Sequence, residues 1–157
     1  MERSSALVRM GSEVVKLVPG DTDDLSVALW DTGSCVAASV GDTDTALAYI
    51  EDRIRVLETM MQKTGEPSAR LCSAYSEKAT TLLDRNELNE VMSLLDRSIA
   101  IRIRLPDFKR EMLFNAVRGK GMYHMVKGEA SKAEPFFQEI LKDREDKYGV
   151  DDTKNNR

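Results

Sequence analysis

Few side chains in this chain of 157 residues could do acid–base or nucleophilic chemistry. The chain has one histidine, His124, and two cysteines, Cys35 and Cys72. A cysteine beside a histidine is a common nucleophile, because the imidazole accepts the proton of the thiol. No local pattern joins His124 to either cysteine. We therefore expect His124 to pack or to lie at a rim, both thiols to stay reduced, and the protein not to be an enzyme.

Two further patterns match ligand-binding loops only in part. Asp21, Asp23 and Asp24 lack the regular alternation and the twelfth-position glutamate of a calcium loop. The Gly-Lys-Gly segment at 119–121 lacks the preceding strand and the full spacing of a phosphate-binding loop, and it falls inside a predicted helix. We expect the aspartates to form a solvated connection that caps the next helix. The sequence predicts no metal ion and no cofactor.

Charge is distributed unevenly along the chain. The 23 basic and 27 acidic residues give a formal net charge of −4, which disfavours nucleic-acid binding. Residues 21–58 hold nine acidic and two basic side chains, whereas residues 97–120 hold seven basic and two acidic ones. Solvated faces explain this distribution. Alternatively, the two regions meet oppositely charged patches on a partner or on another copy of the chain.

The amino-terminal residues carry no recognisable targeting signal. Residues 1–20 interrupt their short apolar groups with charged side chains, and a secretory signal needs an unbroken apolar segment. No later run approaches the roughly 18 consecutive apolar residues of a membrane span. We expect no membrane association and a location in the cytoplasm or the nucleus.

Start and stop signals predict seven helices and no strand. Apolar residues recur at helical spacing between breaks made by glycine and proline. Pro135 falls early in the last helix, where its ring removes a backbone hydrogen bond, so we expect a kinked or delayed start there. The third predicted helix follows Asp42 and Asp44, which can cap it, and ends near residue 62. The other six span about residues 4–17, 24–40, 68–84, 88–104, 108–127 and 131–147.

One pattern recurs three times in the chain. Residues 79–102 match residues 121–144 at an offset of 42. A further copy at residues 30–54 matches residues 75–99 at an offset of 45. Each copy has small residues where two helices approach and a large residue one turn later, and we expect Leu95 and Phe137 to be buried. A residue that tolerates positive φ lies between the helices. The small residues are Ser34, Ala79 and Gly121, then Ala46, Val91 and Ala133; the large ones are Ile50, Leu95 and Phe137; the turn residues are Gly41, Asn86 and Gly128.

This unit resembles the tetratricopeptide repeat, which has an aromatic residue, a small residue four later, a turn glycine, an early alanine and a large residue one turn on. The usual period is about 34 residues, and the spacing of 42 to 45 is similar to the longer repeats of kinesin light chains and of fungal tetratricopeptide proteins. The resemblance implies an all-α fold, a right-handed α-solenoid of antiparallel helix pairs. It implies a capping helix at 1–20 left from a preceding repeat, three repeats at 21–149 and a disordered tail at 150–157. The first unit offers Trp30, Ser34, Gly41, Ala46 and Ile50.

Ligands of that family usually lie along the concave surface formed by the first helix of each unit. The lysine and asparagine set with which some relatives grip a terminal carboxylate is absent here. The resemblance implies a scaffold that binds a peptide or helix of a protein partner in this groove. The alternative is an accessory protein that binds a small molecule or assists a partner enzyme, which an enclosed pocket would favour over an open trough. The residues that the resemblance selects are Asp31, Cys35, Ser76, Thr80, Asn115, Arg118 and Met122.

Overall fold

The computed structural model describes residue 6 and residues 23–149, and this part of the chain is all-helical, without a strand. Apart from Ala6, the predicted capping helix at 1–20 and the predicted tail at 150–157 lie outside the described residues. The described helices are α2 (Asp23–Ser39), α3 (Thr43–Thr64), α4 (Ala69–Asp84), α5 (Val91–Arg102), the 3₁₀ helix η1 (Arg110–Leu113), α6 (Phe114–Val126) and α7 (Ala130–Tyr148).

Three predicted helix starts differ from those in the structure. Helix α5 begins at Val91 rather than near residue 88, and no side chain caps its first turn. The helix predicted at 108–127 begins as a tight 3₁₀ turn, η1, before α6 continues as an α-helix. Of the kinked or delayed start expected at Pro135, the delayed start is wrong, because α7 begins at Ala130 and includes the proline.

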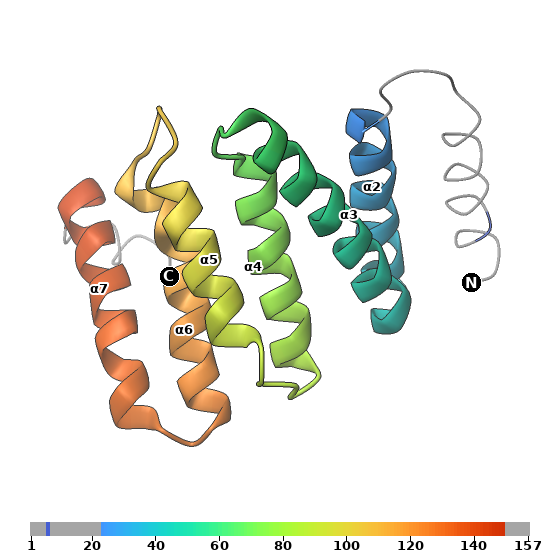
Figure 1. The fold of residues 1–157 in the computed structure, drawn as a ribbon. Coiled ribbons are helices and arrows are strands. Elements are labelled where there is room, and N and C mark those ends of the chain that lie inside the picture. Colours follow the sequence, from blue (N-terminus) through green and yellow to red (C-terminus); the bar gives the residue numbers. More distant parts are fainter. Residues whose placement is uncertain (1–5, 7–22, 150–157) are drawn as a thin grey trace.

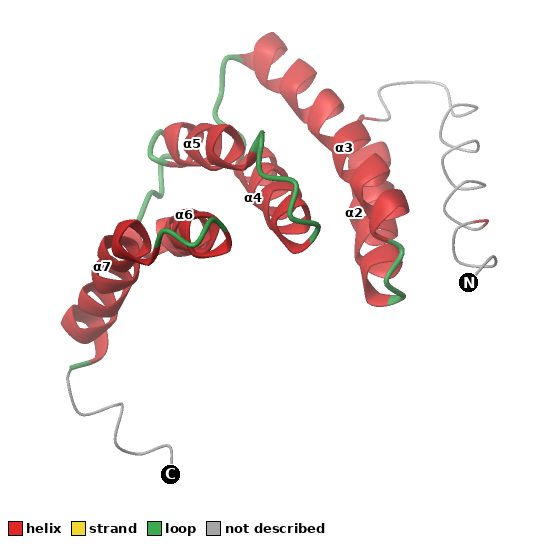
Figure 2. Ribbon diagram, turned by 90° about the horizontal axis from the view of Figure 1, so that it is seen from below, coloured by secondary structure: helices red, strands yellow, loops and turns green. Residues whose placement is uncertain are grey.

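The helices pack in pairs that follow chain order. Helix α2 packs against α3, α4 against α5 and α6 against α7, and we call these pairs the first, second and third units. Neighbouring units meet where α4 contacts α3 and where α6 contacts α4 and α5. Figure 1 shows the units side by side along the molecule, and Figure 2 shows the row from below. The first helices of the second and third units are therefore neighbours.

The turn inside each unit has the backbone conformation that the repeat pattern predicts. Gly41, Asn86 and Gly128 have φ angles of 78°, 59° and 73°. Such positive values suit glycine, which has no Cβ, and asparagine, whose short side chain tolerates this region. A residue with positive φ thus lies in the turn between the two helices of every unit.

The core includes one of the two large residues that the sequence places there. Leu95 is 1% exposed, and its side chain lies against Gly119 of the third unit, where an added Cβ would come within 2.9 Å of Leu95 Cδ2. Phe137 packs on Gly121 of its own unit but is only partly buried. The prediction of a buried Phe137 is wrong, because α6 covers Leu95 whereas no described helix covers the corresponding side of α7.

Candidate functional site

A groove of about 390 Å³ lies between the exposed faces of α4 and α6. We call it the central groove. Five of the seven residues that the sequence selects line it, two from α4 and three from α6. The two helices hold the same place in consecutive units, so the repeat brings residues about 40 positions apart to facing walls. These five residues are Ser76, Thr80, Asn115, Arg118 and Met122.

The hydroxyl groups on the α4 wall already have partners within the protein. Ser76 Oγ lies 3.0 Å from Ser98 Oγ, and Ser98 Oγ donates to the Cys72 carbonyl at 2.9 Å. Thr80 Oγ1 donates to the Ser76 carbonyl at 3.0 Å. A hydroxyl whose proton is engaged can still accept a hydrogen bond, but it adds little to the recognition of an acidic group. These two α4 hydroxyl groups therefore shape the groove more than they select a ligand.

The α6 wall carries the side chains that are free to meet a partner. Asn115, Arg118 and Met122 follow one another at helical spacing on a single face. Arg118 is exposed, and its guanidinium forms no ion pair or hydrogen bond with any described residue. Met122 is 39% exposed, and Met125 and Val126 continue this apolar surface towards the end of α6. A cationic group and adaptable apolar side chains thus share one helical face.

Asp31 lies outside the central groove, in an ion-pair network between the first and second units whose Glu77 lines the groove. The Arg53 guanidinium, whose side chain is 4% exposed, pairs with Asp31 through one terminal nitrogen and with Glu77 through the other. Glu77 also accepts a hydrogen bond of 3.0 Å from Ser34, while Arg53 Nε has no partner. Cys35 is an exposed free thiol on α2 and lines neither hollow described here.

Sequence reasoning missed Arg53 and Glu77, although the helical pattern held a signal for the first. Arg53 lies three residues after Ile50 and four before Leu57, on the face that α3 buries. A charged residue at such a position needs a partner of opposite charge, because an unpaired buried charge is costly. The pattern does not tell which carboxylates supply that partner, since Asp31 and Glu77 lie on two other helices.

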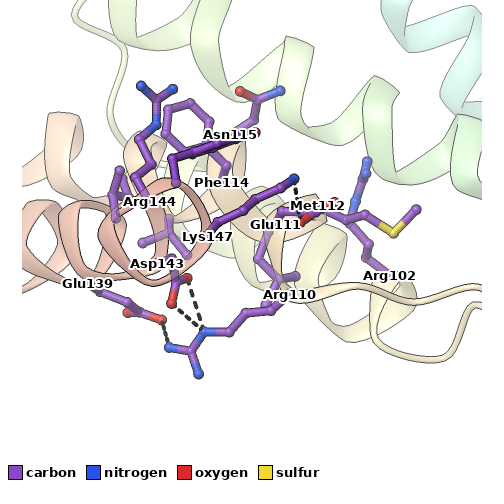
Figure 3. A pocket seen from close by; sticks show the side chains of 14 residues that line it. Arg102, Arg110, Glu111, Met112, Phe114, Asn115, Glu139, Asp143, Arg144 and Lys147 are labelled. Carbon is purple, nitrogen blue, oxygen red and sulfur yellow. Dashed lines mark hydrogen bonds and ion pairs between the residues drawn. The ribbon is translucent and has the colours of Figure 1, made fainter. Parts of the chain in front are cut away.

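A second hollow of about 610 Å³ adjoins the central groove at the third unit. We call it the terminal cleft. Its walls are η1 with the first turn of α6 on one side and the second half of α7 on the other (Figure 3). Three residues line both hollows, namely Arg102, Met112 and Asn115. The sequence analysis did not select this cleft, which depends on the way η1 leads into α6.

His124 lies in the last helical turn of α6, just before the connection to α7. Its Nδ1 lies 2.8 Å from Glu129 Oε2, and its ring stacks on Phe136 with centroids 5.8 Å apart. The hydrogen bond from His124, and a second one from Lys132, lower the pKa of Glu129 to about 2. The contacts of the imidazole thus join the two helices of the third unit, which agrees with the packing role expected for it.

The described residues form neither a metal-ion cluster nor a helix that could cross a membrane. Over 23–149, no three histidine, cysteine or carboxylate side chains gather where they could share a metal ion. None of the described helices combines the length and the apolar composition that crossing a bilayer requires. The two hollows that α4, α6 and α7 line are the candidate binding sites of the described residues.

Comparison of the chain with family models, curated proteins and solved structures gives no match in any of the three. The likeness to tetratricopeptide repeats therefore rests on the repeat pattern in the sequence.

Proposed function

We propose that this protein is an interaction scaffold of the tetratricopeptide type, which binds a peptide or helix of a partner protein in the central groove. The observation that carries the proposal is the α6 wall, where the Arg118 guanidinium, which has no partner among the described residues, lies one turn from the exposed Met122. The pairing of helices in chain order and the shared left-handed turns support a right-handed α-solenoid of antiparallel pairs. An open groove of this kind suits a partner segment.

The charges of the groove indicate what that segment must present. Arg118 favours an acidic side chain or a backbone carbonyl, and Met122 favours an apolar side chain one helical turn away. Asp84 also lines the groove at the end of α4 and would repel a run of acidic residues. The proposed partner therefore places a single acidic or carbonyl group on Arg118 and an apolar anchor beside it.

Partner capture with matched charge variants tests this proposal. Arg118→Glu should lose a protein that the unchanged chain recovers from its native cells, while its helical content and melting temperature stay nearly unchanged, because an exposed charge contributes little to folding. Arg104→Glu is the control, since Arg104 is exposed and lines neither hollow. Met122→Asp should weaken capture of the same protein.

The captured protein is then cut into overlapping peptides, and each peptide is titrated against the purified chain. A peptide that binds the unchanged chain and the Arg104→Glu variant, but binds Arg118→Glu at least tenfold more weakly, supports the central groove. Equal recovery of partners by all variants would remove the groove from consideration, and the acidic surface of residues 21–58 would become the next candidate.

A further inference from the structure

The terminal cleft has the size of a small-molecule site. Its volume of about 610 Å³ falls within the roughly 300–1,000 Å³ that ligand pockets usually enclose. Apolar side chains from both walls line it together with charged ones. Concave sites with an apolar lining and a few polar groups are typical of ligand binding. The apolar residues include Val117 at its floor, with Leu113, Phe114, Ile140 and Tyr148 around it.

The repeat shows that this surface differs from its counterpart in the second unit. An offset of 42 relates Ile101 to Asp143 and Leu105 to Lys147. Ile101 and Leu105 are buried, whereas Asp143 is half-buried and Lys147 is exposed in the cleft. Charges at these positions would be costly beneath a further packed helix. The cleft is therefore suited to a polar occupant rather than to the apolar face of another helical unit.

Ion pairs across one side of the cleft neutralise its carboxylates. Arg110 on η1 lies 3.0 Å from Glu139 and 2.9 Å from Asp143 on α7, and Lys147 of α7 lies 2.9 Å from Glu111 of η1. Figure 3 shows these pairs joining the two walls. A peptide that ran along the cleft would have to separate them. The bridged walls therefore favour a compact ligand, and all three carboxylates are occupied.

Two arginines of the cleft keep donors available. Arg102 and Arg144 are repeat counterparts at the offset of 42, and neither forms an ion pair with a described residue. The Arg144 guanidinium lies 4.8 Å from the centre of the Phe114 ring. Stacking uses the face of the guanidinium and leaves its N–H groups, which point outwards in its plane, free to bind an oxyanion. Arg102 donates a long hydrogen bond of 3.5 Å to Ser73 Oγ and also interacts with the Cys72 thiol, which leaves its other N–H groups for a ligand.

We propose that the terminal cleft is a second binding site, which takes a small aromatic anion. The carboxylate or phosphate group of the ligand binds Arg102 and Arg144, and its ring packs against the apolar residues of the cleft beside Phe114. This site shares Arg102 with the central groove, whereas Arg144 and Phe114 line the terminal cleft and not the central groove, so a loss of binding at Arg144 tests the cleft separately.

A titration of the full chain, followed by amide chemical shifts in nuclear magnetic resonance, tests the site. Phenyl phosphate and benzoate are the probes, and benzyl alcohol is the neutral control. We expect saturable shifts at Phe114 and Arg144, which line the terminal cleft and not the central groove, with a dissociation constant on the order of millimolar for so small a ligand. The amide signal of Thr80 should not shift, because Thr80 lines the central groove and not the terminal cleft. Tighter binding of phenyl phosphate identifies a phosphate ligand, and tighter binding of benzoate identifies a carboxylate.

Matched variants attribute the binding to the arginines. Arg144→Met and Arg102→Met should each weaken binding about tenfold, since each removes a charge-assisted hydrogen bond, while Arg104→Met should bind like the unchanged chain. Circular dichroism shows whether each variant stays folded. No saturable shift with either anion, equal binding of benzyl alcohol, or unchanged affinity in Arg144→Met would overturn the proposal. Shifts confined to the central groove would also overturn it without affecting the proposed scaffold function.

Discussion

Gly119→Ala offers a sharp test of how the second and third units fit together. An added Cβ at this position would lie 2.9 Å from Leu95 Cδ2 and 3.1 Å from Cδ1. Leu95 is 1% exposed and has little room to move, so overpacking should cost about 1–3 kcal/mol. Alanine gains about 1 kcal/mol over glycine within a helix. We therefore expect Gly119→Ala to destabilise the protein by about 1 kcal/mol.

The sign of this effect should reverse when the large partner is removed. Leu95→Ala alone should cost about 2–5 kcal/mol, because it deletes buried methyl groups and leaves a cavity. In that background the methyl group of Gly119→Ala meets no Cδ atoms, so its helix preference remains and it should stabilise the protein by about 1 kcal/mol. The coupling between the two sites is then about 2 kcal/mol. Leu95→Val provides a milder background if Leu95→Ala fails to fold.

Urea denaturation followed by circular dichroism measures these changes in the free energy of unfolding. Gly121→Ala is the matched comparison, because its Cβ would lie 2.8 Å from Phe137 Cζ and the partly exposed Phe137 ring can move outwards. It should therefore destabilise the protein less than Gly119→Ala. If Gly119→Ala has the same sign and size with and without Leu95, the close contact between α5 and α6 is not as described.

Two other changes test the third unit. Phe137→Ala should cost about 1–3 kcal/mol in urea denaturation, less than Leu95→Ala, because Phe137 is only partly buried; an equal loss in both variants would contradict the exposure of its ring. The lowered pKa of Glu129, about 2 in the folded protein against an ordinary 4.5, means that its ionised form is stabilised by folding. Its contribution should be fully present above pH 4.5 and disappear as the pH falls through 2. Denaturation of Glu129→Gln against pH should lack this part of the acid dependence, and an unchanged profile would show that His124 and Lys132 do not hold the carboxylate.

Local features of the fold could be predicted from the sequence, because they depend on neighbouring residues. Apolar spacing and breaks predicted the described helices to within a few residues, and the repeat predicted positive φ at Asn86 as well as at two glycines. Starts of helices were less certain, since α5 begins without a side-chain cap and α6 follows a 3₁₀ turn. Pro135 misled the prediction because α7 begins five residues earlier, at Ala130, and accommodates the missing backbone hydrogen bond inside the helix.

The sequence by itself determined the three-unit pattern and the helical class, and the resemblance drawn from it selected five of the residues that line the central groove. Tertiary structure decided which side chains have partners. Arg53 pairs with carboxylates on two other helices, Ser76 is hydrogen-bonded to Ser98, and Arg118 has no partner within residues 23–149. The terminal cleft arises in the same way, since η1 and α7 meet only once the third unit has folded. Helical periodicity records which residues share a face, whereas ion pairs and hollows depend on distances between segments far apart in the chain.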